Sequence, residues 1–159
     1  MGITEIQVPM INCVRTNSNN KDFQQLVQEL DADLQRRDGE EHGFYAQFNK
    51  IDMLQHVIVA YENGIPVGCG AIKPNEIGAM EVKRMYVLPN RRGAGIASII
   101  LQNLEHWALD LSFIKCVLET GKRQPEAIAL YQKNGYEIIP NFGQYKDVAN
   151  SICFEKILR

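Results

Sequence analysis

The sequence predicts an α/β (α+β) fold, in which helices flank a mixed, mostly antiparallel central sheet of about seven strands. Two observations carry this prediction. Glu62-Asn63-Gly64 lies between two apolar segments, which is the pattern of a tight hairpin between antiparallel strands. Residues 80–101 combine a strand, a loop with two glycines and an amphipathic helix, so the sheet is expected to end in a strand–helix–strand crossover.

The expected elements follow from apolar periodicity and from the residues that start and stop them. Asn19 or Asn20 caps the first helix, and Pro125 opens the last one. In residues 38–50 the aromatic Phe44, Tyr45 and Phe48 either pack in the core, which we favour, or line a substrate pocket. The predicted strands are residues 3–14, 56–61, 65–72, 80–88, 114–119, 136–139 and 151–157, and the predicted helices are residues 19–37, 95–111 and 125–133.

Composition narrows the classes of function. The chain has 159 residues, 45% of them hydrophobic, so it can bury one core, and we expect one domain over residues 1–159. A net charge of −2 gives no general basic face for nucleic acid. The four cysteines lie far apart, which indicates buried free thiols and no metal site. No apolar run reaches the roughly 20 residues of a membrane span, so we expect a cytoplasmic protein without a membrane partner.

The loop after residues 80–88 has the features of an anion cradle. Gly93 and Gly95 carry no Cβ, so a ligand can approach the backbone there. The helix that follows directs unpaired N–H groups and the positive end of its dipole toward the loop. A phosphate or pyrophosphate is the expected guest, with Arg91 and Arg92 adding positive charge. The alternative is an ordinary glycine turn with two solvated arginines.

Three phosphate-loop patterns can be compared with this segment. A Walker loop is excluded, because no Lys-Ser or Lys-Thr pair follows the glycines. The dinucleotide fingerprint is only nearly met, because Ser98 replaces its third glycine, although Glu119 ends the next strand about where a ribose-binding acid belongs. The pattern R-G-x-G-x-(G/A) is satisfied throughout by Arg92, Gly93, Ala94, Gly95, Ile96 and Ala97.

Two segments together resemble a known family. Residues 85–105, MYVLPNRRGAGIASIILQNLE, are similar to the acetyl-CoA-binding motif of the GCN5-related N-acetyltransferases (GNAT). Residues 127–139, AIALYQKNGYEII, resemble the second signature of that family, and the two are separated, as in the family, by a helix and a strand. The resemblance covers residues 57–139. It implies a sheet splayed between its fourth and fifth strands, with the pantetheine arm of acetyl-CoA lying in the gap.

The resemblance also implies where the co-substrate binds. The main chain of Met85, Tyr86 and Val87 would pair with the pantetheine, and an N–H near Val87 would polarise the acetyl carbonyl. Gln124 stands where the family often has an asparagine that contacts the same arm. The implied pyrophosphate cradle consists of Arg92, Gly93, Ala94, Gly95, Ile96, Ala97 and Ser98.

Acetyl transfer to an amine requires a base for the ammonium proton and a donor for the leaving thiolate. Tyr131 matches the family's tyrosine near the thioester sulfur, and the alternative is a core tyrosine on an amphipathic helix. Glu81 matches a glutamate that some relatives use as the base. It shares a strand face with Lys83 and Met85 unless a bulge intervenes. A solvated glutamate paired with a lysine, or ordered water as the base, remains open.

The sequence thus predicts an acetyl-CoA-dependent N-acetyltransferase that acts on a primary amine of a small molecule by direct attack in a ternary complex. The alternatives are a protein lysine or N-terminal acetyltransferase, or an acyl-CoA-binding module without catalysis. Lys83 and Arg84 could hold a carboxylate of the acceptor. A homodimer through the edge of the last strand, residues 151–157, is a further expectation.

Overall fold

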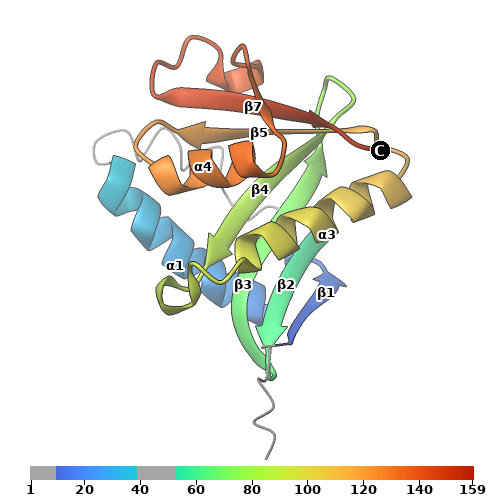
Figure 1. Cartoon of the computed structure of the whole chain (residues 1–159), viewed down its shortest axis with the longest axis vertical. Coiled ribbons are helices and arrows are strands. Elements are labelled where there is room, and N and C mark those ends of the chain that lie inside the picture. Colours follow the sequence, from blue (N-terminus) through green and yellow to red (C-terminus); the bar gives the residue numbers. More distant parts are fainter. Residues whose placement is uncertain (1–9, 39–52) are drawn as a thin grey trace, which may run out of the picture.

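A single mixed sheet organises the molecule (Figure 1). In a computed structural model, residues 10–38 and 53–159 are described, and they form a seven-stranded sheet in the order β1-β2-β3-β4-β5-β7-β6. The predicted fold class is confirmed. The strands are β1 (Ile11–Thr16), β2 (His56–Glu62), β3 (Ile65–Pro74), β4 (Met80–Val87), β5 (Lys115–Gly121), β6 (Glu137–Ile139) and β7 (Ser151–Ile157).

The first four strands pair antiparallel in chain order, and β5, β7 and β6 form a second antiparallel group. The two groups join through β4 and β5, which run parallel and pair only at Met80↔Cys116 and Glu81↔Val117. Beyond these pairs the two strands diverge, as Figure 1 shows. We call the opening between residues 82–87 of β4 and 118–121 of β5 the fork. The predicted splay between the fourth and fifth strands is confirmed.

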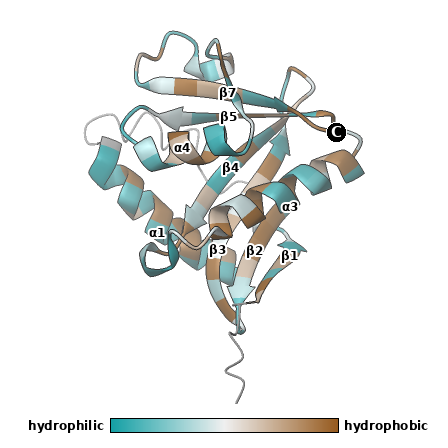
Figure 2. Ribbon diagram, in the orientation of Figure 1, coloured by the Kyte–Doolittle hydropathy of each residue, from teal (hydrophilic) through white to brown (hydrophobic). Residues whose placement is uncertain are grey.

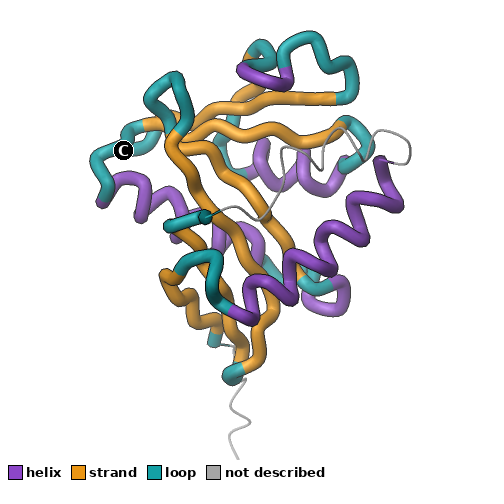
Figure 3. The backbone as a smooth tube through the Cα atoms, turned by 180° about the vertical axis from the view of Figure 1, so that it is seen from behind, coloured by secondary structure: helices purple, strands orange, loops and turns teal. Residues whose placement is uncertain are grey.

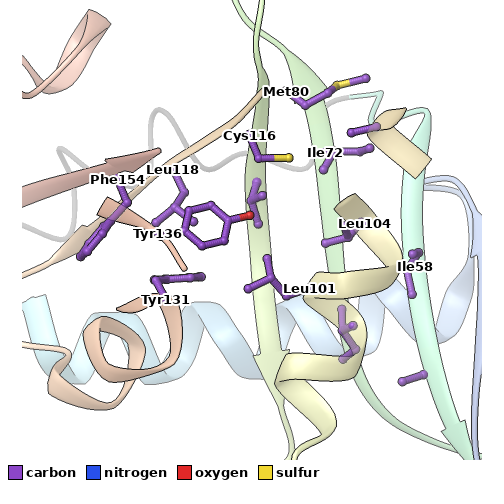
Figure 4. Packing of buried hydrophobic residues seen from close by; sticks show 14 of the residues in the cluster. Ile58, Ile72, Met80, Leu101, Leu104, Cys116, Leu118, Tyr131, Tyr136 and Phe154 are labelled. Atoms are coloured by element: carbon purple, nitrogen blue, oxygen red, sulfur yellow. The ribbon is translucent and has the colours of Figure 1, made fainter. Parts of the chain in front are cut away.

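Helices cover both faces of the sheet (Figure 3). Helix α3 (Ile96–Asp110) and helix α4 (Pro125–Lys133) share one core with the sheet, and helix α1 (Lys21–Asp38) contributes to a second core on the other face. Figure 2 shows hydrophobic residues concentrated in the central strands β2 and β3, which both cores use. In Figure 4, Tyr131 of α4 lies close to Tyr136, Leu118 and Phe154, while Leu101 and Leu104 of α3 approach the middle of the sheet.

Local signals explain the ends of these elements. The Asn20 side-chain oxygen accepts a hydrogen bond from Phe23 N at 2.9 Å, so Asn20 is the cap of α1. The β2–β3 hairpin turns at Asn63 and Gly64, whose φ angles of 52° and 79° are both positive, as a type I′ turn requires. Strand β1 starts at Ile11, and the predicted start at residue 3 lies outside the described residues, as do Phe44, Tyr45 and Phe48.

Two further expectations can be compared with the structure. Cys69, Cys116 and Cys153 are buried free thiols as predicted, and Cys13 is half-buried. The expectation that β7 is a free edge is wrong, because β7 pairs with β5 on one side and with β6 on the other. None of the helices in the described ranges is long and apolar enough to cross a membrane.

Candidate active site

The fork opens into a cavity of about 450 Å³. The end of α1, the strands β4 and β5, the loop before α3 and helix α4 all contribute to its lining. Every predicted site residue except Ala94 lines this cavity. These residues are Glu81, Met85, Tyr86, Val87, Arg92, Gly93, Gly95, Ile96, Ala97, Ser98, Gln124 and Tyr131.

A β-bulge in β4 determines which side chains face which side of the fork. Cys69 pairs with Tyr86 and Ala71 with Lys83, so β4 holds one residue more than β3 between these pairs. Arg84, in the bulge, has a φ of 60°. Lys83 stays on the α1 face, whereas Met85 turns to the α3 face, where its sulfur lies over Gly70.

The bulge that the sequence left open as an exception is therefore present, and Glu81 does not share a face with Met85, because the extra residue reverses the alternation of side chains. The expected proximity of Glu81 to Lys83 is confirmed, because Lys83 Nζ lies 3.0 Å from Glu81 Oε2. Arg84 is also engaged, since its Nη1 lies 2.9 Å from Asp31 Oδ1 of α1. Both cations proposed for an acceptor carboxylate thus already form ion pairs, and what supports that hypothesis is Arg84 Nη2, which is buried without a hydrogen-bond partner among the described residues.

The loop between β4 and α3 presents open backbone. Gly93 and Gly95 have φ angles of 83° and 81°, a region that favours glycine, and a Cβ added at either would meet no protein atom within 4 Å. The intrahelical hydrogen bonds of α3 begin with Ile99 N donating to Gly95 O at 3.1 Å. The N–H groups of the preceding turn point out of the helix. The shape and polarity of this cradle fit a pyrophosphate.

The two arginines of this loop contact the protein itself. Arg91 forms an ion pair with Glu62 of β2. Arg92 Nε donates to Val87 O at 2.9 Å, and its guanidinium lies 5.5 Å from the centroid of the Tyr86 ring. Both arginines therefore hold the loop against the sheet. Their predicted contribution of charge to an anion stays a prediction.

Tyr131 lies at the inner side of α4, where its ring packs 5.8 Å from Tyr136 and 5.9 Å from Phe154. The residue is 6% exposed and lines the cavity. Burial, and then the negative charge of Glu119, raise the pKa of the Tyr131 hydroxyl above its ordinary value. At neutral pH this hydroxyl therefore keeps its proton and can act as a hydrogen-bond donor.

Two further residues line the cavity without a predicted role in the transfer itself. Glu119, which the sequence suggested only as a ribose-binding acid, lines the cavity from β5, and Ser151 Oγ donates to its Oε2 at 2.6 Å. Tyr145 of the short helix η3 (Gly143–Tyr145) is 3% exposed and also lines the cavity. Its segment, residues 141–145, is a candidate pocket wall by its resemblance to a loop of some small-molecule members of the family. Burial, then Glu81 and Glu119, raise the pKa of Tyr145. An acidic residue inside the apolar run of β5 was the available signal for Glu119.

The fold and the site together are typical of one class of protein. The mixed sheet splits between β4 and β5, the glycine loop at the start of α3 lies beside the split, and a tyrosine hydroxyl that can donate a hydrogen bond lines it. A family model described as "Acetyltransferase (GNAT) family" matches residues 23–136. The chain belongs to the GNAT family and is an acyltransferase.

Individual relatives agree with this membership. The IAA acetyltransferase of Azospirillum brasilense is 34% identical over 159 residues, which cover 95% of this chain and 100% of the relative. A crystal structure of a Klebsiella pneumoniae protein assigned to the acyl-CoA N-acyltransferases is 31% identical, with a TM-score of 0.75, covering 94% of this chain and 99% of that one. A GNAT acetyltransferase from Elizabethkingia anophelis, solved with acetyl-CoA bound, shares the fold at 18% identity, with a TM-score of 0.65 and coverage of 93% and 98%.

Proposed function

We propose that this protein transfers the acetyl group of acetyl-CoA to a primary amine of a small molecule, by direct attack in a ternary complex. The observation that carries the proposal is the fork: beyond Glu81 the edge of β4 has no strand partner on the β5 side among residues 10–38 and 53–159, and the glycine cradle lies at its end. A free strand edge can pair with an extended ligand, and a helix start can bind a pyrophosphate. Acetyl-CoA supplies an extended pantetheine arm, a pyrophosphate and a reactive thioester.

The backbone of β4 supports the role predicted for Val87. Leu88 N donates to Val67 O on the β3 side, at 2.9 Å. Because successive residues of a strand alternate in the direction of their N–H and C=O groups, the Val87 groups face the fork. Its carbonyl already accepts from Arg92, so its N–H is the group that would polarise an acetyl carbonyl. Met85 lies two residues before Val87, so by the same alternation its backbone groups also face the fork.

Side chains would supply the remaining steps. The protonated Tyr131 hydroxyl would donate a hydrogen bond to the leaving sulfur. Glu81 remains a candidate base, but taking up a proton would give up its charge interaction with Lys83. Gln124, just before α4, and Ser98, in the first turn of α3, line the cavity where they could contact the arm and the pyrophosphate. We further propose one domain over residues 1–159; a cytoplasmic location and a homodimer stay predictions.

Calorimetric titration with acetyl-CoA, with CoA and NAD as comparisons, tests the first step. We expect micromolar binding of acetyl-CoA and CoA and none of NAD. A panel of small primary amines, together with a lysine-containing peptide and a peptide with a free N-terminus, then tests the acceptor by thiol release. Absence of acetyl-CoA binding would refute the proposal. Turnover of the peptides alone would replace the small-molecule acceptor with a protein, and binding without any thiol release would indicate an acyl-CoA-binding module.

A further inference from the structure

We propose that Glu119 is the carboxylate that binds the acceptor's ammonium group and takes its proton. This inference rests on the proposed function and adds a catalytic residue and an acceptor class to it: a small primary amine that is charged in solution.

Glu119 and Glu81 lie on the same face of the sheet. In β5, Cys116 and Leu118 belong to the core under α3 and α4, so the alternating residues Val117 and Glu119 face the other side. Glu81 pairs directly with Val117, and directly paired residues share a face. The two carboxylates therefore lie on one face near the closed end of the fork, and both line the cavity. Two carboxylates in one cleft attract a cation, which an amine is at neutral pH.

Glu119 is also the carboxylate whose charge reaches the proposed proton donor. It is the charged group that, after burial, raises the pKa of Tyr131, whereas Glu81 is not among the causes of that shift. The negative charges of both glutamates raise the pKa of Tyr145. An acid and a base that serve one acyl transfer must flank the same carbonyl carbon, so the base must lie near Tyr131. Glu119 meets this condition from its place in the cavity lining.

Ser151 positions the Glu119 side chain. Ser151 Oγ donates to Glu119 Oε2 at 2.6 Å, from β7, the strand next to β5. The buried Tyr145 ring closes the same side of the cavity. In the proposed step one N–H bond of the ammonium breaks and one O–H bond forms on Glu119, while the electron pair stays on nitrogen as the nucleophile. Glu119 later releases the proton to water.

The variant Glu119→Gln, compared with the exposed control Glu137→Gln on β6, tests this role with two acceptors. One acceptor is an aliphatic amine, charged at neutral pH, and the other is an arylamine, neutral at the same pH. We expect Glu119→Gln to lower kcat/KM for the aliphatic amine by about 100-fold and to affect the arylamine far less. CoA affinity, measured by calorimetry, should equal that of the wild type and of Glu137→Gln.

The pH profile with the aliphatic amine gives a second measurement. Without the base, activity should follow the free amine and rise steadily with pH, whereas the wild type should reach a plateau earlier. Equal losses with both acceptors, or an unchanged profile, would overturn the assignment and indicate a structural role. If the wild type binds acetyl-CoA but acetylates no amine, the proposed function itself fails and Glu119 loses its role with it.

Discussion

The two sides of the fork are built in different ways. The donor side, proposed for acetyl-CoA, consists of the loop at Gly93 and Gly95, the edge of β4 and Tyr131 of α4. Most of it is main chain, and it comes from two continuous stretches of sequence. The acceptor side, which we propose for the amine, consists of Glu81, Lys83, Glu119 and Tyr145, which are side chains from two strands and a short helix. In this proposal the co-substrate would be bound mainly through backbone, and side chains would select the acceptor.

The bulge in β4 separates these two sides. Arg84 takes a φ of 60°, which is unusual for a residue with a Cβ. Its guanidinium is anchored by Asp31 of α1, and its side chain is only 3% exposed. The bulge sends Met85 to the core under α3 and leaves Lys83 beside Glu81 on the other face. One extra residue therefore divides the strand into an acceptor-side half and a donor-side half.

The largest expected effect comes from Tyr131→Phe, on the donor side. This variant keeps the buried ring and removes the hydroxyl, so the thiolate would leave without a hydrogen-bond donor. We expect kcat to fall on the order of 100-fold or more, while CoA affinity stays the same. An assay of thiol release over time measures kcat, and calorimetry measures CoA affinity. Tyr61→Phe, whose hydroxyl contacts Asp22 away from the cavity, is the control and should retain kcat. A parallel loss of CoA affinity would mean that Tyr131 acts in binding.

Alkaline pH should lower the free energy of unfolding, which affects both sides of the fork together. Burial raises the pKa of Cys69, in the core under α1, and of Cys116, in the core under α3, to about 12 each. In the unfolded chain these thiols lose their protons near pH 8.5. The folded state then binds more protons than the unfolded state, so stability is complete below about pH 8.5 and falls as pH rises toward 12.

The expected slope approaches about 1.4 kcal/mol per pH unit for each thiol. Urea unfolding from neutral pH into this window, up to about pH 10.5, measures it. The double variant Cys69→Ala, Cys116→Ala should show a flatter dependence on pH, whatever its stability at neutral pH. An equally steep fall in that variant would assign the effect to other groups, such as the buried tyrosines.

This contrast explains how much the sequence could predict. The donor side was accessible because the two segments that resemble the family are each continuous in the sequence, and the donor-side residues that this resemblance implied line the cavity, apart from Ala94. The order of β1 to β4 was accessible for the same reason, since each turn signal joins neighbours in the chain. The insertion of β7 between β5 and β6 was missed, because it depends on pairing between distant segments.

On the acceptor side, Glu81 and Lys83 were predicted as site residues, whereas the place of Glu119 in the same cavity was missed, because its physical basis is nonlocal. Glu119 accepts a hydrogen bond from Ser151, which is 32 residues further along the chain. Arg84 forms its ion pair with Asp31, which is 53 residues away. Neither contact leaves a periodic pattern in the sequence. The bulge is likewise invisible in the apolar–polar alternation, so the sequence could name it only as an exception that would separate Glu81 from Met85.

A smaller effect is expected from Gly95→Ala, which tests the backbone nature of the donor side. Gly95 has a φ of 81°, so a Cβ should cost about 1–2 kcal/mol of stability. Gly78→Ala is a matched control, since Gly78 has a φ of 76°, open space around it and no part in the cavity lining. Both variants should lose similar stability in thermal unfolding. Only Gly95→Ala should weaken CoA binding, by roughly 10-fold, or about 1.4 kcal/mol. Equal CoA affinity in the two variants would show that Gly95 has no part in binding CoA.

The smallest expected effect comes from Lys83→Met, on the acceptor side. Lys83 neutralises Glu81 at 3.0 Å, and both side chains are largely buried, so the lysine competes with an incoming ammonium group for that carboxylate. Its removal should lower KM for an aliphatic amine a few-fold, by roughly 2–5 times, with CoA affinity unchanged. Lys21→Met, at the exposed start of α1, controls for the loss of one surface charge. A higher KM would show that Lys83 contacts the acceptor itself, which would return the carboxylate-bearing acceptor to consideration and weaken the case for a cationic one.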